Sequence, residues 1–176
     1  MVTIAPASLH AFLPDESTLG EAPLVWPLPE SIELSDAFLR LCQLPHCVWL
    51  DSAKQIGTLG RYSFLTADPL EFVAADKACA DPLGLLGKHQ ALLQQKPLAG
   101  LPPFQGGICG VLGYDLCRTL EPIEAAKHDD LPTPPIAFGL YDWTICYDHQ
   151  CRQGWIISQG WPSPIRKDVV LKRRND

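Results

Sequence analysis

The chain has 176 residues, the length of one domain or of one domain within a larger protein. Apolar residues make up 47% of the chain, which is enough for a hydrophobic core. The charged fraction of 19% is below the roughly 25% usual in soluble proteins. A low charged fraction fits a chain that buries part of its surface against another domain or protein. The net charge of −6 argues against a nucleic-acid partner, and the apolar runs are far shorter than the roughly 18 residues that span a bilayer, so no membrane segment is expected.

The N-terminus and the cysteines both favour a cytoplasmic protein. The segment MVTIAPASLHAFLPDES has no basic region and no long apolar core, so no signal peptide is predicted. The seven cysteines are odd in number, include no CxxC pair and match no Cys/His spacing typical of zinc. We therefore expect reduced thiols that serve as small core hydrophobes.

The N-terminal part begins with a proline-rich stretch. Proline removes a backbone donor and favours extended chain, so residues 1–33, with APLVWPLPES around Trp26, predict an N-terminal arm and an edge strand. Ser35 is the expected N-cap of a helix over residues 35–44, which ends before Pro45. Strand-like runs follow at residues 46–50, 61–65 and 70–76.

The clearest helix begins at Asp81 and Pro82, an N-cap followed by proline in the first helical position. His89 falls on its apolar face, and we interpret this histidine as a packed or surface residue rather than a ligand. The other members of that face are Leu85, Leu86, Leu92 and Leu93.

A glycine-rich segment, FQGGICGVLGYDLCRTLE over residues 104–121, follows this helix. Glycine costs backbone entropy and offers no side chain for packing, yet aliphatic residues lie between the glycines. The mixture predicts a buried strand that another backbone or a ligand approaches closely. A short helical turn should come next, with a surface ion pair between Arg118 and Glu121.

The C-terminal part predicts a β-hairpin. Residues 123–135 form a polar loop, in which His128, Asp129 and Asp130 are interpreted as solvated rather than as metal ligands. The longest β-like run covers residues 136–147, and residues 151–158 return as its antiparallel partner after a turn. The basic stretch at residues 163–176 is interpreted as a frayed tail.

These elements predict an α+β protein with mostly antiparallel sheets and a few flanking helices, with the domain itself at residues 34–162. The sequence contains no G-x-S-x-G elbow, phosphate-binding P-loop or dinucleotide fingerprint. Ser52 and Arg61, taken singly, are equally well explained as caps of strand ends. Composition and pattern alone therefore leave a globular domain of unknown role.

Three motifs, in a fixed order along the chain, indicate a family. LDSAKQIGTLGRYSFLTADP, FQGGICGVLGYDLCRTLE and GLYDWTICYDHQ resemble segments of the chorismate-using synthases, the family of anthranilate synthase component I and aminodeoxychorismate synthase component I. The match covers roughly residues 46–160. The Y-D-W…D-H-Q hairpin is similar to the aminodeoxychorismate branch, so the resemblance implies chorismate amination for para-aminobenzoate and folate synthesis.

The resemblance implies the N-terminal part of a fold with two antiparallel sheets around an active site. The family's magnesium-binding glutamates and reactive lysine motif lie in a downstream half that we do not find here, so no catalytic or metal residue is assigned. Because the reaction needs a metal and a positioned base or nucleophile, this chain alone is expected to be inactive. It would be a natural fragment, a truncated chain or a split subunit.

The family also implies partners and a ligand. A glutamine amidotransferase subunit would supply ammonia, a separate C-terminal chorismate-binding half would complete the enzyme, and L-tryptophan would bind a pocket at Ser52, Leu59, Gly60, Arg61 and Tyr62. A hydroxyl and a guanidinium beside an apolar slot suit a zwitterionic amino acid. Two alternatives stay open: an anthranilate synthase domain in tryptophan synthesis, or a non-catalytic amino-acid-binding or interaction module.

Overall fold

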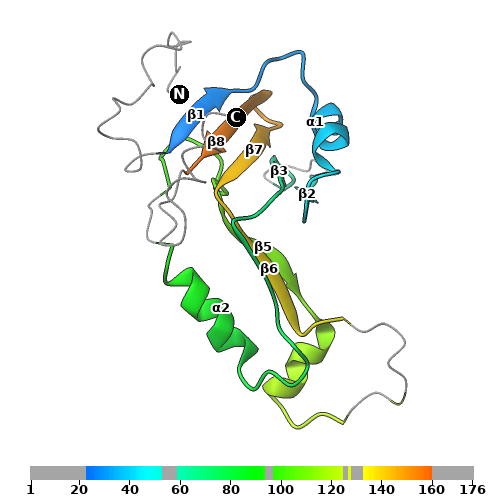
Figure 1. Ribbon diagram of the computed structural model, residues 1–176. Helices are drawn as coiled ribbons and strands as arrows, with labels where there is room; N and C mark the ends of the chain where they lie inside the picture. Colours follow the sequence, from blue (N-terminus) through cyan, green and yellow to red (C-terminus); the bar gives the residue numbers. More distant parts are fainter. Residues whose placement is uncertain (1–22, 53–58, 94–96, 125–126, 128–132, 160–176) are drawn as a thin grey trace.

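The computed structural model describes residues 23–52, 59–93, 97–124, 127 and 133–159 (Figure 1). Their strands form two antiparallel sheets, as the sequence predicted. The five-stranded sheet has the order β1 (Leu24–Pro27), β8 (Gln153–Ser158), β7 (Trp143–Asp148), β3 (Tyr62–Thr66) and β2 (Val48–Leu50). The three-stranded sheet has the order β4 (Glu71–Ala74), β6 (Ile136–Tyr141) and β5 (Gly107–Leu112).

The helix α1 (Leu34–Leu41) covers one face of the five-stranded sheet. Its first residue is preceded by Glu33 in the N-cap position, and Glu33 makes no side-chain cap, so the prediction that Ser35 caps this helix was wrong. The helix is held by packing instead, because Ala37 is buried against Leu65 and the Phe38 ring lies 4.9 Å from the Trp49 ring.

The helix α2 (Pro82–Gln90) covers one face of the three-stranded sheet. Asp81 caps it as predicted, because its carboxylate accepts a 2.7 Å hydrogen bond from the N–H of Gly84. His89 is packed, with Nδ1 2.8 Å from the Leu85 carbonyl oxygen and its ring edge-on to Phe138 at 5.2 Å. The interpretation of His89 as a packed residue is confirmed.

The longest β-like run of the sequence is not one strand. It divides at Asp142 into β6, which belongs to the three-stranded sheet, and β7, which belongs to the five-stranded sheet. Figure 1 shows this stretch passing from one sheet to the other. The continuous apolar pattern concealed the division because both halves are buried, and the structure shows it by pairing β6 with β5 and β7 with β8.

The glycine-rich strand β5 confirms the predicted close backbone approach. A Cβ atom on Gly110 would lie 2.1 Å from the carbonyl oxygen of Ala137 on the neighbouring strand. The prediction that this strand is buried was wrong, because β5 is the outer strand of its sheet and Val111 and Leu112 near its end are exposed. After β5 the chain forms the expected short turn, η3 (Tyr114–Thr119). Arg118 pairs with Asp115 at 3.2 Å, three residues away on the same turn, so the predicted partner Glu121 was wrong.

Several predictions fall outside the described residues, namely most of the N-terminal arm, the polar group His128 to Asp130, and the basic tail at residues 163–176.

The seven cysteines are all within the described ranges and none forms a disulfide. Cys146 is buried and Cys151 exposed. Neither α1 nor α2 nor any other helix in the described ranges has the length and apolar character to cross a bilayer.

Candidate functional site

The pairing of β2 with β3 brings the predicted binding residues together. Leu50 lies opposite Phe64, so the residues just after β2 meet those at the start of β3. The Ser52 hydroxyl donates a short hydrogen bond to the carbonyl oxygen of Tyr62. The hydroxyl proton of Ser52 is therefore used within the protein, while its oxygen can still accept.

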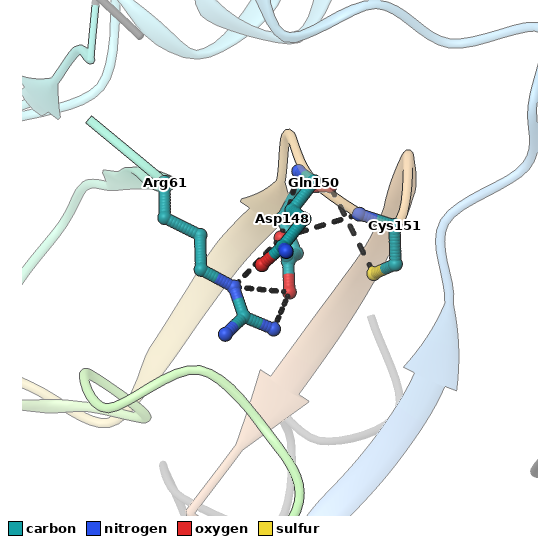
Figure 2. Close-up of polar contacts among 4 residues, drawn as sticks. All are labelled: Arg61, Asp148, Gln150 and Cys151. Carbon is teal, nitrogen blue, oxygen red and sulfur yellow. Dashed lines mark hydrogen bonds and ion pairs between the residues drawn. The ribbon is translucent and has the colours of Figure 1, made fainter. Parts of the chain in front are cut away.

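Arg61 is held by a residue that the sequence analysis did not single out. Its Nε lies 3.1 and 3.0 Å from the two carboxylate oxygens of Asp148, and its Nη2 lies 2.6 Å from Oδ2 (Figure 2). The hydrogen bond to Asp148 raises the pKa of the Arg61 guanidinium. Asp148 comes from the end of β7, 87 residues further along the chain.

Asp148 also organises its own turn. Its Oδ1 accepts a 2.9 Å hydrogen bond from the N–H of Gln150, and Figure 2 shows Gln150 and Cys151 beside it. Burial raises the pKa of this carboxyl group, but hydrogen bonds from Arg61 and from the backbone of Gln150 and Cys151 outweigh burial, so the net pKa lies below its ordinary value. Asp148 is therefore ionised at neutral pH.

His149 anchors the other side of the same segment. Its Nε2 lies 2.8 Å from the hydroxyl oxygen of Ser63, which also lies 3.2 Å from Oδ1 of Asp51 and accepts from the N–H of Ser52 at 3.0 Å. Ser63 has one hydroxyl proton, which it donates to Oδ1 of Asp51. His149 therefore donates from Nε2–H. Because Ser63 is fully buried, this Ser–His pair is structural rather than a nucleophile with its base.

An aromatic cluster lies on the same face of β3 as Tyr62. Since side chains alternate along a strand, Tyr62 and Phe64 share a face, with ring centroids 6.2 Å apart. Phe104 meets Phe64 edge-on at 5.7 Å, and the guanidinium carbon of Arg61 lies 4.8 Å above the Tyr62 ring. Phe64 and Phe104 were missed as site residues, although the spacing of Tyr62 and Phe64 within a strand was a usable signal.

The other two predicted residues contribute little direct contact. The side chain of Leu59 is 72% exposed, and Gly60 has a φ of 70°, the left-handed conformation that favours glycine at the turn before β3. The structure thus unites Ser52, Arg61 and Tyr62, with Gly60 shaping the turn.

A separate open groove of about 1140 Å³ lies on the α1 side of the five-stranded sheet. Its lining includes Trp49, Asp51, Tyr147, His149 and Glu30. Because Trp49 pairs with Leu65 in the sheet register, this groove opens on the face opposite Tyr62 and Phe64.

Side chains that could hold a metal are not clustered in the part of the chain that the structure describes. Among residues 23–52, 59–93, 97–124, 127 and 133–159, no three His, Cys, Asp or Glu side chains come together in a group that could hold a metal. No chemical step through a metal is assigned to these residues.

The chain is similar in sequence to aminodeoxychorismate synthases and anthranilate synthases. Aminodeoxychorismate synthase component 1 of Salmonella typhimurium is 31% identical over 156 residues, covering 72% of this chain and 34% of the relative. Anthranilate synthase component 1 of Streptomyces coelicolor is 33% identical over 147 residues, covering 83% of this chain and 28% of the relative. No protein-family model matches the chain.

The fold has a counterpart among solved structures. Anthranilate synthase component I from Streptococcus pneumoniae superposes with a TM-score of 0.50 at 22% identity, and the match covers 82% of this chain and 34% of that one. The two antiparallel sheets of this chain thus have a counterpart in the fold of that structure. The chain belongs to the family of aminodeoxychorismate synthase component I and anthranilate synthase component I, and it spans about a third of the length of the relatives that it matches.

Proposed function

We propose that this chain is the N-terminal domain of an aminodeoxychorismate synthase component I, which takes part in the amination of chorismate to 4-amino-4-deoxychorismate for folate synthesis in the cytoplasm. The observation that carries the proposal is the turn Asp148-His149-Gln150. It carries the hairpin motif that is typical of this branch, and two of its side chains bind the Gly-Arg-Tyr-Ser segment of the first motif.

The reaction needs more than this domain. We propose that a polypeptide corresponding to the other two thirds of the relatives binds chorismate and Mg²⁺, and that a glutamine amidotransferase subunit supplies ammonia. The apolar side chains left exposed near the end of β5 and around η3, which are Val111, Leu112, Tyr114, Leu120 and Ile123, support this division.

The domain's own ligand in this proposal is L-tryptophan, bound at Ser52, Leu59, Gly60, Arg61 and Tyr62. The Arg61 guanidinium would hold the carboxylate, and the half-buried rings of Tyr62, Phe64 and Phe104 would receive the indole. Isothermal titration of the intact chain with L-tryptophan tests this, with Arg61→Ala as the variant that should lose binding. Equal heats from both proteins would reject the pocket.

Anthranilate synthase component I is the second candidate. The Streptomyces coelicolor relative of that name matches 83% of this chain, more than the 72% matched by the Salmonella relative. Both enzymes use the same fold, so the identity of the product must decide between them.

A reconstitution experiment tests the main proposal. The chain is mixed with chorismate, ammonia and Mg²⁺, with and without a C-terminal chorismate-binding polypeptide from a relative, and the products are separated by chromatography. We expect 4-amino-4-deoxychorismate only from the complete mixture. Anthranilate as the product would favour the second candidate, and turnover by the lone chain would contradict the division of labour.

A further inference from the structure

The turn between β7 and β8 holds both sides of the candidate amino-acid site. Asp148 binds the side chain of Arg61, and the neighbouring His149 binds Ser63, whose hydroxyl holds the N–H of Ser52. The N–H of His149 also donates to the carbonyl oxygen of Arg61 at 2.8 Å. One turn therefore fixes two segments that come from a different part of the chain.

The Arg61 guanidinium keeps donors for a ligand. Arginine has five N–H groups, and Asp148 occupies the edge formed by Nε and Nη2. Two hydrogens on Nη1 and one on Nη2 remain. One hydrogen from each of these nitrogens lies along the same edge, which matches a second carboxylate in bidentate geometry. Within the described residues, no side chain or carbonyl is hydrogen-bonded to Nη1.

Arg61 depends on Asp148 for its orientation. The Arg61 side chain is 41% exposed, whereas that of Asp148 is 5% exposed, so the aspartate is the fixed partner and the arginine the adaptable one. A long exposed side chain loses conformational entropy when a ligand immobilises it, and this loss lowers the affinity. An ion pair that already holds the side chain before binding reduces the loss. Asp148 orients the guanidinium before any ligand arrives.

His149 plays the matching role for Ser52. Its Nε2–H donates to Ser63, the Ser63 proton goes to Asp51, and the Ser63 oxygen accepts from the N–H of Ser52. Ser63 is fully buried, so its hydroxyl oxygen is shielded from water at the centre of this network, while Asp51 and His149 line the open groove. The position of the Ser52 hydroxyl beside Tyr62 thus depends on His149.

We propose that Asp148 and His149 are positioning residues for an α-amino acid with an aromatic side chain: Asp148 presents the free edge of Arg61 to the ligand carboxylate, and His149 holds Ser52 in place through Ser63. The inference rests on the proposed amino-acid site, and it adds two residues to that site that contact Arg61 and Ser63 rather than the ligand.

The charge of Asp148 and its orienting role predict opposite changes in ligand affinity for Asp148→Asn. Asp148 is an anion close to where a ligand carboxylate would bind, so charge alone predicts that Asp148→Asn tightens binding. Orientation predicts the reverse, because the neutral amide holds the guanidinium more weakly. The direction of the change therefore distinguishes a positioning role from simple electrostatics.

The experiment is isothermal titration of the full chain with two probes, L-tryptophan and tryptamine, which lacks the carboxylate. We expect Asp148→Asn to weaken L-tryptophan binding by about tenfold and to leave tryptamine binding unchanged. Asp115→Asn removes the same charge from the Asp115–Arg118 pair elsewhere in the protein and serves as the matched control, with no change for either probe. Equal losses for both probes would indicate general loosening and overturn the inference.

The histidine supplies an independent pair of variants. His149→Leu removes the donor to Ser63 and should weaken L-tryptophan binding, while His149→Gln keeps an N–H donor and should restore most of it. This pair decides the question if Asp148→Asn fails to fold. Unchanged L-tryptophan binding in Asp148→Asn or His149→Leu would overturn the role of that residue while leaving the amino-acid site intact. No binding by the unmodified chain would reject the site and the inference together.

Discussion

The two sheets differ in how completely the described residues enclose them. In the five-stranded sheet, Leu65 and Ile157 are fully buried, and polar bonds such as Arg61–Asp148 join strands that are distant in the sequence. In the three-stranded sheet, α2 covers Ile136 and Phe138, but the outer strand β5 ends in apolar residues more than half exposed. The core of the first sheet is buried among the described residues, although Leu50 in its outer strand is exposed, whereas the outer strand of the second sheet leaves two neighbouring apolar side chains exposed.

This contrast has a physical origin. Burial of apolar surface against a partner stabilises a complex by roughly 25 cal/mol for each Å² removed from water. A partner that covers the exposed side chains at the end of β5 would therefore be bound more tightly. The polar network around Ser63 has its hydrogen bonds already made. We therefore expect stability to be governed by the five-stranded sheet and association by the three-stranded sheet.

The largest effect should come from a core truncation in the five-stranded sheet. Leu65 is fully buried, so Leu65→Ala should lower the free energy of unfolding by about 2–5 kcal/mol through lost contacts and a cavity. Leu112→Ala, at a side chain 60% exposed, is the matched control and should change it by about 0.5 kcal/mol or less. Urea unfolding monitored by tryptophan fluorescence measures both. Similar losses of unfolding free energy in the two variants would contradict the expectation that the five-stranded sheet governs stability.

The second variant tests where the three-stranded sheet is tightly packed. Gly110→Ala places a methyl group against the backbone of Ala137 and Phe138 and should cost about 1–3 kcal/mol or more. Gly87→Ala, in α2 with no atom within 4 Å of the added methyl group, should instead stabilise by about 0.5–1 kcal/mol. Thermal unfolding followed by circular dichroism compares them. Tolerance of Gly110→Ala would show that β5 and β6 are less closely paired.

The third prediction concerns pH and the Arg61–Asp148 pair. The pKa of Asp148 is lower in the folded protein than its ordinary value of 3.8, so the pair stabilises the fold above that pH and the stabilisation is lost as the pH falls through the folded pKa. Near neutral pH, Asp148→Asn should cost about 1–2 kcal/mol, since Arg61 is partly exposed and remains solvated. Urea titrations at a series of pH values should show the difference between the two proteins shrinking below about pH 4.

The smallest expected effect is at the N-cap of α2. Asp81→Ala removes the acceptor of the Gly84 N–H and should cost about 1 kcal/mol, with Asp81→Asn close to the unmodified chain because it keeps an acceptor. Differential scanning calorimetry resolves such a shift in a domain of this size. A loss as large as that of Leu65→Ala would mean that α2 contributes more to the fold than its cap alone explains.

Local chemistry made part of this structure predictable from the sequence. Asp81 followed by Pro82 marks a helix start wherever it occurs, and glycines spaced among aliphatic residues mark a strand with a close neighbour, so α2 and β5 were both foreseen. The motif order likewise indicated the family and the two-sheet fold. Each single motif, like the start of α2 and the glycine pattern of β5, is contained within a segment of at most 20 residues.

The tertiary structure alone decided the features that depend on strand pairing. The run from Ile136 to Tyr147 reads as one strand, and only its separate partners assign β6 and β7 to different sheets. The register that places Tyr62 opposite Asp148 likewise determines that Arg61 meets this carboxylate. A charge pair between residues 87 positions apart leaves no periodic trace in the sequence, because it depends on which strands become neighbours.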